Sequence, residues 1–133
     1  MRKLAREICF ELIFEILVRD EGEMNPLSFS TLCEQENVLD DQDKDYVNKI
    51  VNTFVQNKEE IKNAIFSKIT TFEPDRVYKI DLALLCLGVT EIKYVGEVDF
   101  KIVINEVVEL AKKFSSEKSP KFTNGVLSAI VKG

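Results

Sequence analysis

Apolar residues recur at helical spacing in nearly every segment of this chain, and this pattern limits the folds open to it. The first segment, residues 2–19, carries Leu4, Ile8, Leu12 and Ile16 on one stripe, with further apolar residues on the next. No stretch shows sustained strand alternation between hairpin turns. The sequence therefore predicts an all-α fold.

Capping residues and prolines divide the chain into about seven expected helices. Asn25-Pro26 and Ser119-Pro120 each place an N-cap residue before a first-turn proline, and an acidic cap lies at residues 40–43. The expected helices are 2–19, 26 to about 37, one from the cap at 40–43 to 57, 58 to about 69, 74 to about 94, 100–114, and 119 onward. Residues 1–133 are therefore expected to form a compact single-domain bundle.

The longest apolar run extends from Leu82 to Val89 and is eight residues long. A bilayer requires about 20 apolar residues, so this run is too short to cross one. A helix that is apolar on nearly all sides belongs in the centre of a domain. We therefore expect this helix to form the core, and we expect a cytoplasmic protein without contact to a membrane.

The residue types needed for most catalytic or metal sites are missing or scattered. The chain has no His, and its three Cys residues are far apart, without a Cys-x-x-Cys pair. Its five Gly residues stand alone, which excludes a phosphate-binding glycine loop. Glu106 and Glu109 are three apart and could share a proton or metal, but a solvated helix face is the better interpretation. We expect buried reduced thiols, no cofactor, no metal and no enzymatic activity.

The net charge of −5 argues against nucleic acid, but the charges are unevenly distributed. Residues 20–45 hold nine acidic side chains against Lys44 alone, whereas residues 112–121 hold four lysines against Glu117. A local basic patch is therefore compatible with an acidic protein.

Two clusters of cations suggest an anionic partner. Arg2, Lys3 and Arg6 lie at the start of the first helix, where cations oppose the helix dipole; an ordinary solvated terminus is the alternative. Between residues 111 and 127, phenylalanines alternate with lysines around an expected helix-loop-helix corner. Rings and ammonium groups in this arrangement suit single-stranded RNA, although core packing of the rings is equally compatible with the pattern.

Several segments of the sequence resemble the NusB family. The strongest are VINEVVELAKKF at 103–114 and KFTNGVL at 121–127, which are similar to the C-terminal hallmark of that family. IDLALLCLGVTEI at 80–92 looks like its buried helix, and RKLARE at 2–7 looks like a shortened form of its basic start. The resemblance covers essentially the whole chain and agrees with the expected helices.

This resemblance implies transcription antitermination without catalysis. NusB proteins pair with the ribosomal protein NusE and bind boxA RNA within the antitermination complex of RNA polymerase. By position, the resemblance implies that RNA meets Arg2, Lys3, Arg6, Phe114, Lys118 and Phe122, with Ser119, Lys121 and Asn124 beside them. Phe14 and Asp81 match positions linked to NusE, with apolar packing as an alternative for Phe14. We expect the fold to bring the starts of the first and last helices together into one RNA surface.

The sequence departs from the family pattern at several positions. Lys118 stands where an acidic residue is common, Thr90 replaces a usual Tyr, and Leu4 interrupts the N-terminal basic run. These departures bear on the strength and sequence preference of RNA binding. Two other functions stay open, namely a NusB-like domain related to an RNA methyltransferase and a helical scaffold that binds only protein. The absence of a cofactor-binding glycine loop before the end at Gly133 favours the free-standing antitermination protein.

Overall fold

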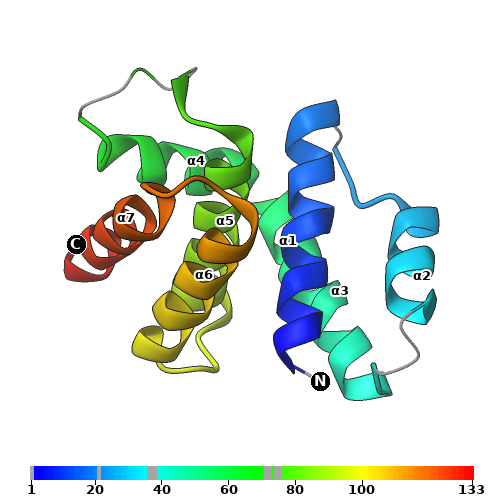
Figure 1. Ribbon diagram of the computed structural model, residues 1–133. Coiled ribbons are helices and arrows are strands. Elements are labelled where there is room, and N and C mark those ends of the chain that lie inside the picture. Colours follow the sequence, from blue (N-terminus) through cyan, green and yellow to red (C-terminus); the bar gives the residue numbers. More distant parts are fainter. Residues whose placement is uncertain (1, 21, 36–38, 71–72, 74–75) are drawn as a thin grey trace.

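The computed structural model describes residues 2–20, 22–35, 39–70, 73 and 76–133, which fold into α-helices joined by short connections (Figure 1). No strand occurs within these residues, which confirms the predicted all-α class. The helices are α1 (Arg2–Arg19), α2 (Pro26–Gln35), α3 (Asp41–Gln56), α4 (Lys58–Ser67), α5 (Lys79–Val89), α6 (Phe100–Phe114) and α7 (Ser119–Lys132). A π-helical turn, η2 (Thr90–Val95), continues α5.

Most helix boundaries follow the local capping signals. Asp40 accepts a hydrogen bond from the backbone N–H of Asp43 at the start of α3, and Asp99 accepts one from that of Lys101 at the start of α6. The fifth helix begins later than predicted: the backbone of Tyr78 is not helical, with φ of −58° and ψ of 137°, and the first helical residue is Lys79. The expected start at Pro74 and Asp75, and Asn37 at the expected end of the second helix, lie outside the described residues.

Helix α5 occupies the centre of the bundle, as its apolar sequence predicted. It contacts α1, α3, α4, α6 and α7, and in Figure 1 it lies between α1 and α7. Every residue from Asp81 to Val89 is buried, and Leu85 is completely inaccessible to solvent. The hydrophobic free energy of folding is therefore concentrated around this helix.

Helices α5 and α7 approach each other closely at Gly88. A Cβ atom added to Gly88 would lie 2.8 Å from Cδ1 of Leu127, closer than carbon atoms pack in proteins. The glycine therefore sets the separation of these two helices. At the end of η2, Gly96 adopts a left-handed backbone with φ of 67° and terminates the helical segment.

The three cysteines are free and buried, as predicted. Burial raises the pKa of the Cys9 and Cys86 thiols, which keeps both protonated at neutral pH. None of the helices within the described ranges is long and apolar enough to cross a membrane.

Candidate nucleic-acid interface

Two of the three predicted cations at the start of α1 are exposed and already interact with neighbouring side chains. Cζ of Arg2 lies 4.0 Å from the centre of the Tyr46 ring, and its Nε is 3.6 Å from Oδ1 of Asp43. Nζ of Lys3 is 3.9 Å from Oε1 of Glu106, on α6. Both cations face solvent beside carboxylates, so a phosphate has to compete with those carboxylates for them.

The third cation, Arg6, lies inside the protein, which corrects the expectation that it contacts phosphate. Its residue surface is only 3% exposed. Its Nε and Nη2 donate hydrogen bonds of 2.9 and 2.8 Å to the two carboxylate oxygens of Glu91, and the Tyr46 hydroxyl donates to Oε1 of Glu91 at 2.5 Å. Because the buried arc of α1 is wide, Arg6 falls on its inner face and serves the fold.

Electrostatics within this cluster favour the paired state. Burial alone lowers the pKa of Arg6, but the hydrogen bond to Glu91 and the nearby Tyr46 outweigh it and raise that pKa above its usual value. Burial, together with nearby Cys9 and Glu91, raises the pKa of Tyr46, so the phenol stays protonated and donates. Glu91 and Tyr46 were not among the residues that the sequence indicated. One sequence feature could have identified them: Glu91 follows an otherwise apolar central helix, and a carboxylate buried there requires a partner.

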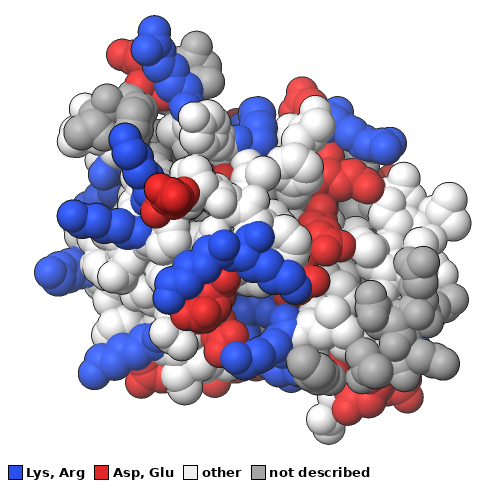
Figure 2. Space-filling model, viewed as in Figure 1, with Lys and Arg blue, Asp and Glu red and all other residues white. Residues whose placement is uncertain are grey.

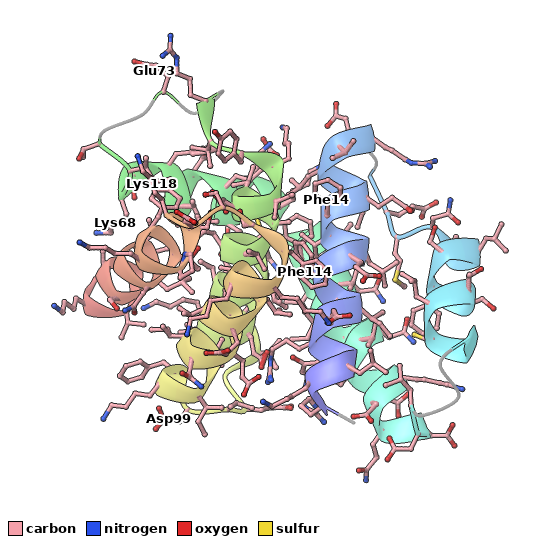
Figure 3. All side chains as sticks on the ribbon, in the orientation of Figure 1. Phe14, Lys68, Glu73, Asp99, Phe114 and Lys118 are labelled. Atoms are coloured by element: carbon pink, nitrogen blue, oxygen red, sulfur yellow. The ribbon has the colours of Figure 1, made fainter. Side chains whose placement is uncertain are left out.

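The aromatic residues of the α6–α7 corner combine core packing with partial exposure. The ring of Phe114 is half-buried, and its centre lies 5.2 Å from that of Phe10, which lies 6.3 Å from that of Phe14. Figure 3 shows Phe14 and Phe114 extending from α1 and α6 into the same seam. Phe122 is also half-buried and packs against the core. Phe114 and Phe122 can therefore each pack against the core and also contact an RNA base.

A chain of hydroxyl groups fixes the backbone of this corner. Ser119 is 1% exposed, and its Oγ lies 2.7 Å from Oγ of Ser115 and 2.9 Å from Oγ of Ser116. The Ser115 hydroxyl donates to Oδ1 of Asp81 at 2.6 Å. The expectation that Ser119 faces RNA is therefore corrected, because its hydroxyl is committed inside the corner. Asp81 is itself only 5% exposed and anchors the start of α7 to the start of α5.

Three predicted polar residues at the corner do reach solvent. Lys118, Lys121 and Asn124 are exposed, and Asn124 accepts a hydrogen bond of 3.3 Å from Ser128. Lys118, Lys121 and Phe122 line a groove of about 1200 Å³ at the surface. In Figure 2, basic side chains gather on the left of the view, over α4 and α7. This corner is the part of the predicted RNA surface that the structure leaves most accessible.

The structure does not bring the starts of α1 and α7 together, which corrects our expectation of one composite surface. Helices α1 and α6 run parallel, since Lys3 pairs with Glu106, Glu7 with Lys113 at 2.7 Å, and Phe10 with Phe114. The end of α6 therefore lies beside the middle of α1, and in Figure 1 the chain then leads away from α1 to the start of α7, on the other side of α5. From Lys3 to Phe10, helix α1 rises about 10 Å, which separates the two clusters.

The two glutamates considered as a shared acidic site interact with different cations. Glu106 faces Lys3, whereas Oε1 of Glu109 lies 3.1 Å from Nζ of Lys112. Within the described part of the chain, His, Cys, Asp and Glu side chains form no group of three or more that could hold a metal ion. Glu106 and Glu109 are thus accounted for as ion-pair partners on the surface of α6.

An all-α bundle with a basic, aromatic-bearing corner defines a small helical domain whose accessible surface suits an anionic polymer. Residues 3–132 match the model of the NusB family. The chain belongs to the NusB family.

Individual NusB proteins are similar to this chain over nearly its whole length. The chain is 36% identical to the transcription antitermination protein NusB of Clostridium novyi over 98% of both chains. It is 39% identical to the NusB protein of Listeria monocytogenes, over 97% of this chain and 94% of the relative. It also resembles a chain in a crystal structure of antitermination factors NusB and NusE in complex with dsRNA. The identity there is 34% and the TM-score 0.85, over 98% of this chain and 96% of the other.

Proposed function

We propose that this protein is a cytoplasmic transcription antitermination factor, without enzymatic activity, that binds boxA-type single-stranded RNA together with NusE. In this role it joins the antitermination complex of RNA polymerase and supports processive transcription of ribosomal RNA operons. The observation that carries the proposal is the corner where exposed Lys118 and Lys121 flank the half-buried ring of Phe122. Family membership supports the biological role.

The charge of the protein explains why a second protein is needed. Phosphate contacts supply most of the affinity for nucleic acid, and this chain carries a net charge of −5. Arg6 is not available to RNA, and Arg2 and Lys3 already interact with carboxylates. We therefore expect weak binding of RNA by the protein alone and tighter binding beside a basic partner. A methyltransferase-related domain is less well supported, because the similarity to antitermination proteins extends over nearly their whole length.

Substitution of Phe122 and Lys121 tests the corner. Phe122→Ala removes a stacking surface worth roughly 1–3 kcal/mol per base, so the affinity for boxA RNA should fall while its salt dependence stays nearly constant. Lys121→Gln should lower the slope of log K against log salt by about 0.7, the value for one phosphate of a single strand. RNA titrations with NusE present at several salt concentrations measure both effects.

The matched control for these titrations is Lys132→Gln, which neutralises an exposed lysine at the far end of α7. It should bind RNA like the parent. Because Phe122 also packs against the core, Phe122→Ala could weaken RNA binding by destabilising the fold. Urea unfolding of this variant measures its stability and separates that effect from the loss of base stacking. Parental RNA affinity in both Phe122→Ala and Lys121→Gln would place the RNA elsewhere on the molecule.

Substitution of Asp81 tests the proposed contact with NusE. Asp81→Asn preserves the size of the side chain but removes its charge, and should weaken NusE binding measured by calorimetry if the carboxylate meets the partner. Ser115→Ala is the control, because it removes the 2.6 Å hydrogen bond and leaves the carboxylate in place. If Ser115→Ala weakens NusE binding as much as Asp81→Asn does, Asp81 acts by holding the corner and does not itself contact NusE.

A further inference from the structure

We propose that the groove between the end of α4, the segment at residues 76–78 and the start of α7 is a second RNA subsite. In this subsite, Lys68, Arg76 and Tyr78 hold the single strand where it continues beyond the corner. The inference rests on the proposed function, because it extends the path of the same RNA. None of these three residues belongs to the sites that the sequence indicated.

The groove concentrates cations that are not neutralised by the protein residues described around them. Lys68, Arg76, Lys118 and Lys121 line it, all four are exposed, and none forms an ion pair with another residue described in the structure. Figure 3 shows Lys68 and Lys118 on the same side of the molecule, from neighbouring elements. Four such cations around one hollow produce a local positive potential on an otherwise acidic protein. This potential favours an anionic ligand.

The acidic side chains of the groove do not cancel this charge. Asp81 lies at its base, is almost fully buried, and accepts a hydrogen bond from Ser115. Glu117 is exposed at the rim beside Lys118. Arg2 and Lys3, at the start of α1, instead have carboxylates at 3.6 and 3.9 Å. The groove is therefore the better phosphate-binding region of the two.

Two aromatic rings in the groove favour RNA over a simple anion. Tyr78 is 67% exposed although its ring is large and apolar, and Phe122 presents its half-buried ring to the same groove. Bases of a single strand stack on such rings while cations follow the backbone. The groove volume of about 1200 Å³ exceeds the roughly 300–1000 Å³ typical of small-molecule sites. The two aromatic rings, the positive charge and the volume of the groove together fit a segment of a nucleic-acid strand.

The groove is continuous with the corner assigned to boxA RNA. Lys118, Lys121 and Phe122 belong to both, so a strand bound at the corner enters the groove past the same two lysines, with Glu117 the exposed carboxylate at the rim. The other direction, along the seam of α1 and α6, meets Glu7 and Glu106 beside Lys113 and Lys3. The strand therefore extends from the corner toward α4 and residue 76.

The test compares RNAs of different length bound to the full chain with NusE present. One RNA contains only the boxA element; two others extend it by several nucleotides on the 5′ or the 3′ side. For the parent, one extension should raise the affinity. The double variant Lys68→Gln, Arg76→Gln should lose this gain yet bind the short RNA like the parent. Its salt slope on the extended RNA should fall by about 0.7 for each phosphate that is no longer neutralised.

A second variant isolates the stacking contribution. Tyr78→Ala should reduce the affinity for the extended RNA about fivefold or more, with an unchanged salt slope, and leave the short RNA unaffected. The matched control neutralises two exposed lysines outside the groove, Lys101→Gln with Lys132→Gln, and should retain the gain from the extension.

The remaining outcomes overturn the inference in distinguishable ways. If the groove variants keep the full gain from the extension, or weaken short and extended RNAs equally, the strand does not occupy the groove. If they instead weaken NusE binding, NusE and not the RNA strand occupies the groove, which Asp81 also lines. If the parent with NusE fails to bind even the short RNA, the proposed function fails and the subsite fails with it.

Discussion

Replacing Leu85 with aspartate is expected to abolish cooperative folding. Leu85 lies at the middle of α5, has no solvent exposure, and is surrounded by neighbouring helices. An unpaired carboxylate there costs several kcal/mol, and the missing leucine packing costs about 2–5 kcal/mol more. Together these costs approach the whole stability of a typical domain, about 5–15 kcal/mol. Circular dichroism during heating measures the result as loss of the unfolding transition.

The control for this experiment is Leu85→Met, which nearly conserves side-chain volume and should cost less than about 1.5 kcal/mol. A cooperative transition of Leu85→Asp at the temperature of the parent would contradict the central position of α5. It would also mean that this part of the helix reaches water in solution.

Replacing Arg6 with alanine should destabilise the protein by about 3–5 kcal/mol, because it leaves the buried carboxylate of Glu91 without its cation. Both guanidinium hydrogen bonds would disappear, and the hydroxyl of Tyr46 would still donate to the carboxylate. Urea denaturation measures the change as a lower midpoint with an unchanged slope. RNA affinity, extrapolated to the fully folded fraction, should change much less, since Arg6 does not reach the surface.

Lys3→Ala is the matched control on the same helix. Lys3 is 71% exposed at its side chain and lies 3.9 Å from Glu106, so its removal should cost less than about 1 kcal/mol. The double variant Arg6→Met, Glu91→Leu removes both charges together and should recover much of the stability that Arg6→Ala forfeits. Equal stability of Arg6→Ala and the parent, combined with a lower salt slope of RNA binding, would restore Arg6 to the RNA surface.

The sequence by itself determined most of the helices and the position of the core. Helices α1 and α6 begin and end where apolar spacing and caps predicted, because both signals are local: turns repeat about every 3.6 residues and caps act within one turn. The central position of α5 followed in the same way from an apolar run with no polar face. Lys118, Lys121 and Asn124 are exposed, as expected for polar residues in and beside a loop.

Only the tertiary structure decided which polar residues serve the fold and which reach solvent. Arg6 and Ser119 have the sequence pattern of surface residues, but Arg6 pairs with Glu91 of a distant segment, and Ser119 is held through Ser115 by Asp81 of α5. Pairing of this kind leaves no local periodicity to detect. The parallel course of α1 and α6 likewise separates the two basic clusters that the sequence suggested would join. The same packing brings Lys68, Arg76 and Tyr78 to the groove beside Phe122, because the contacts between helices, and not their separate patterns, determine which surfaces become continuous.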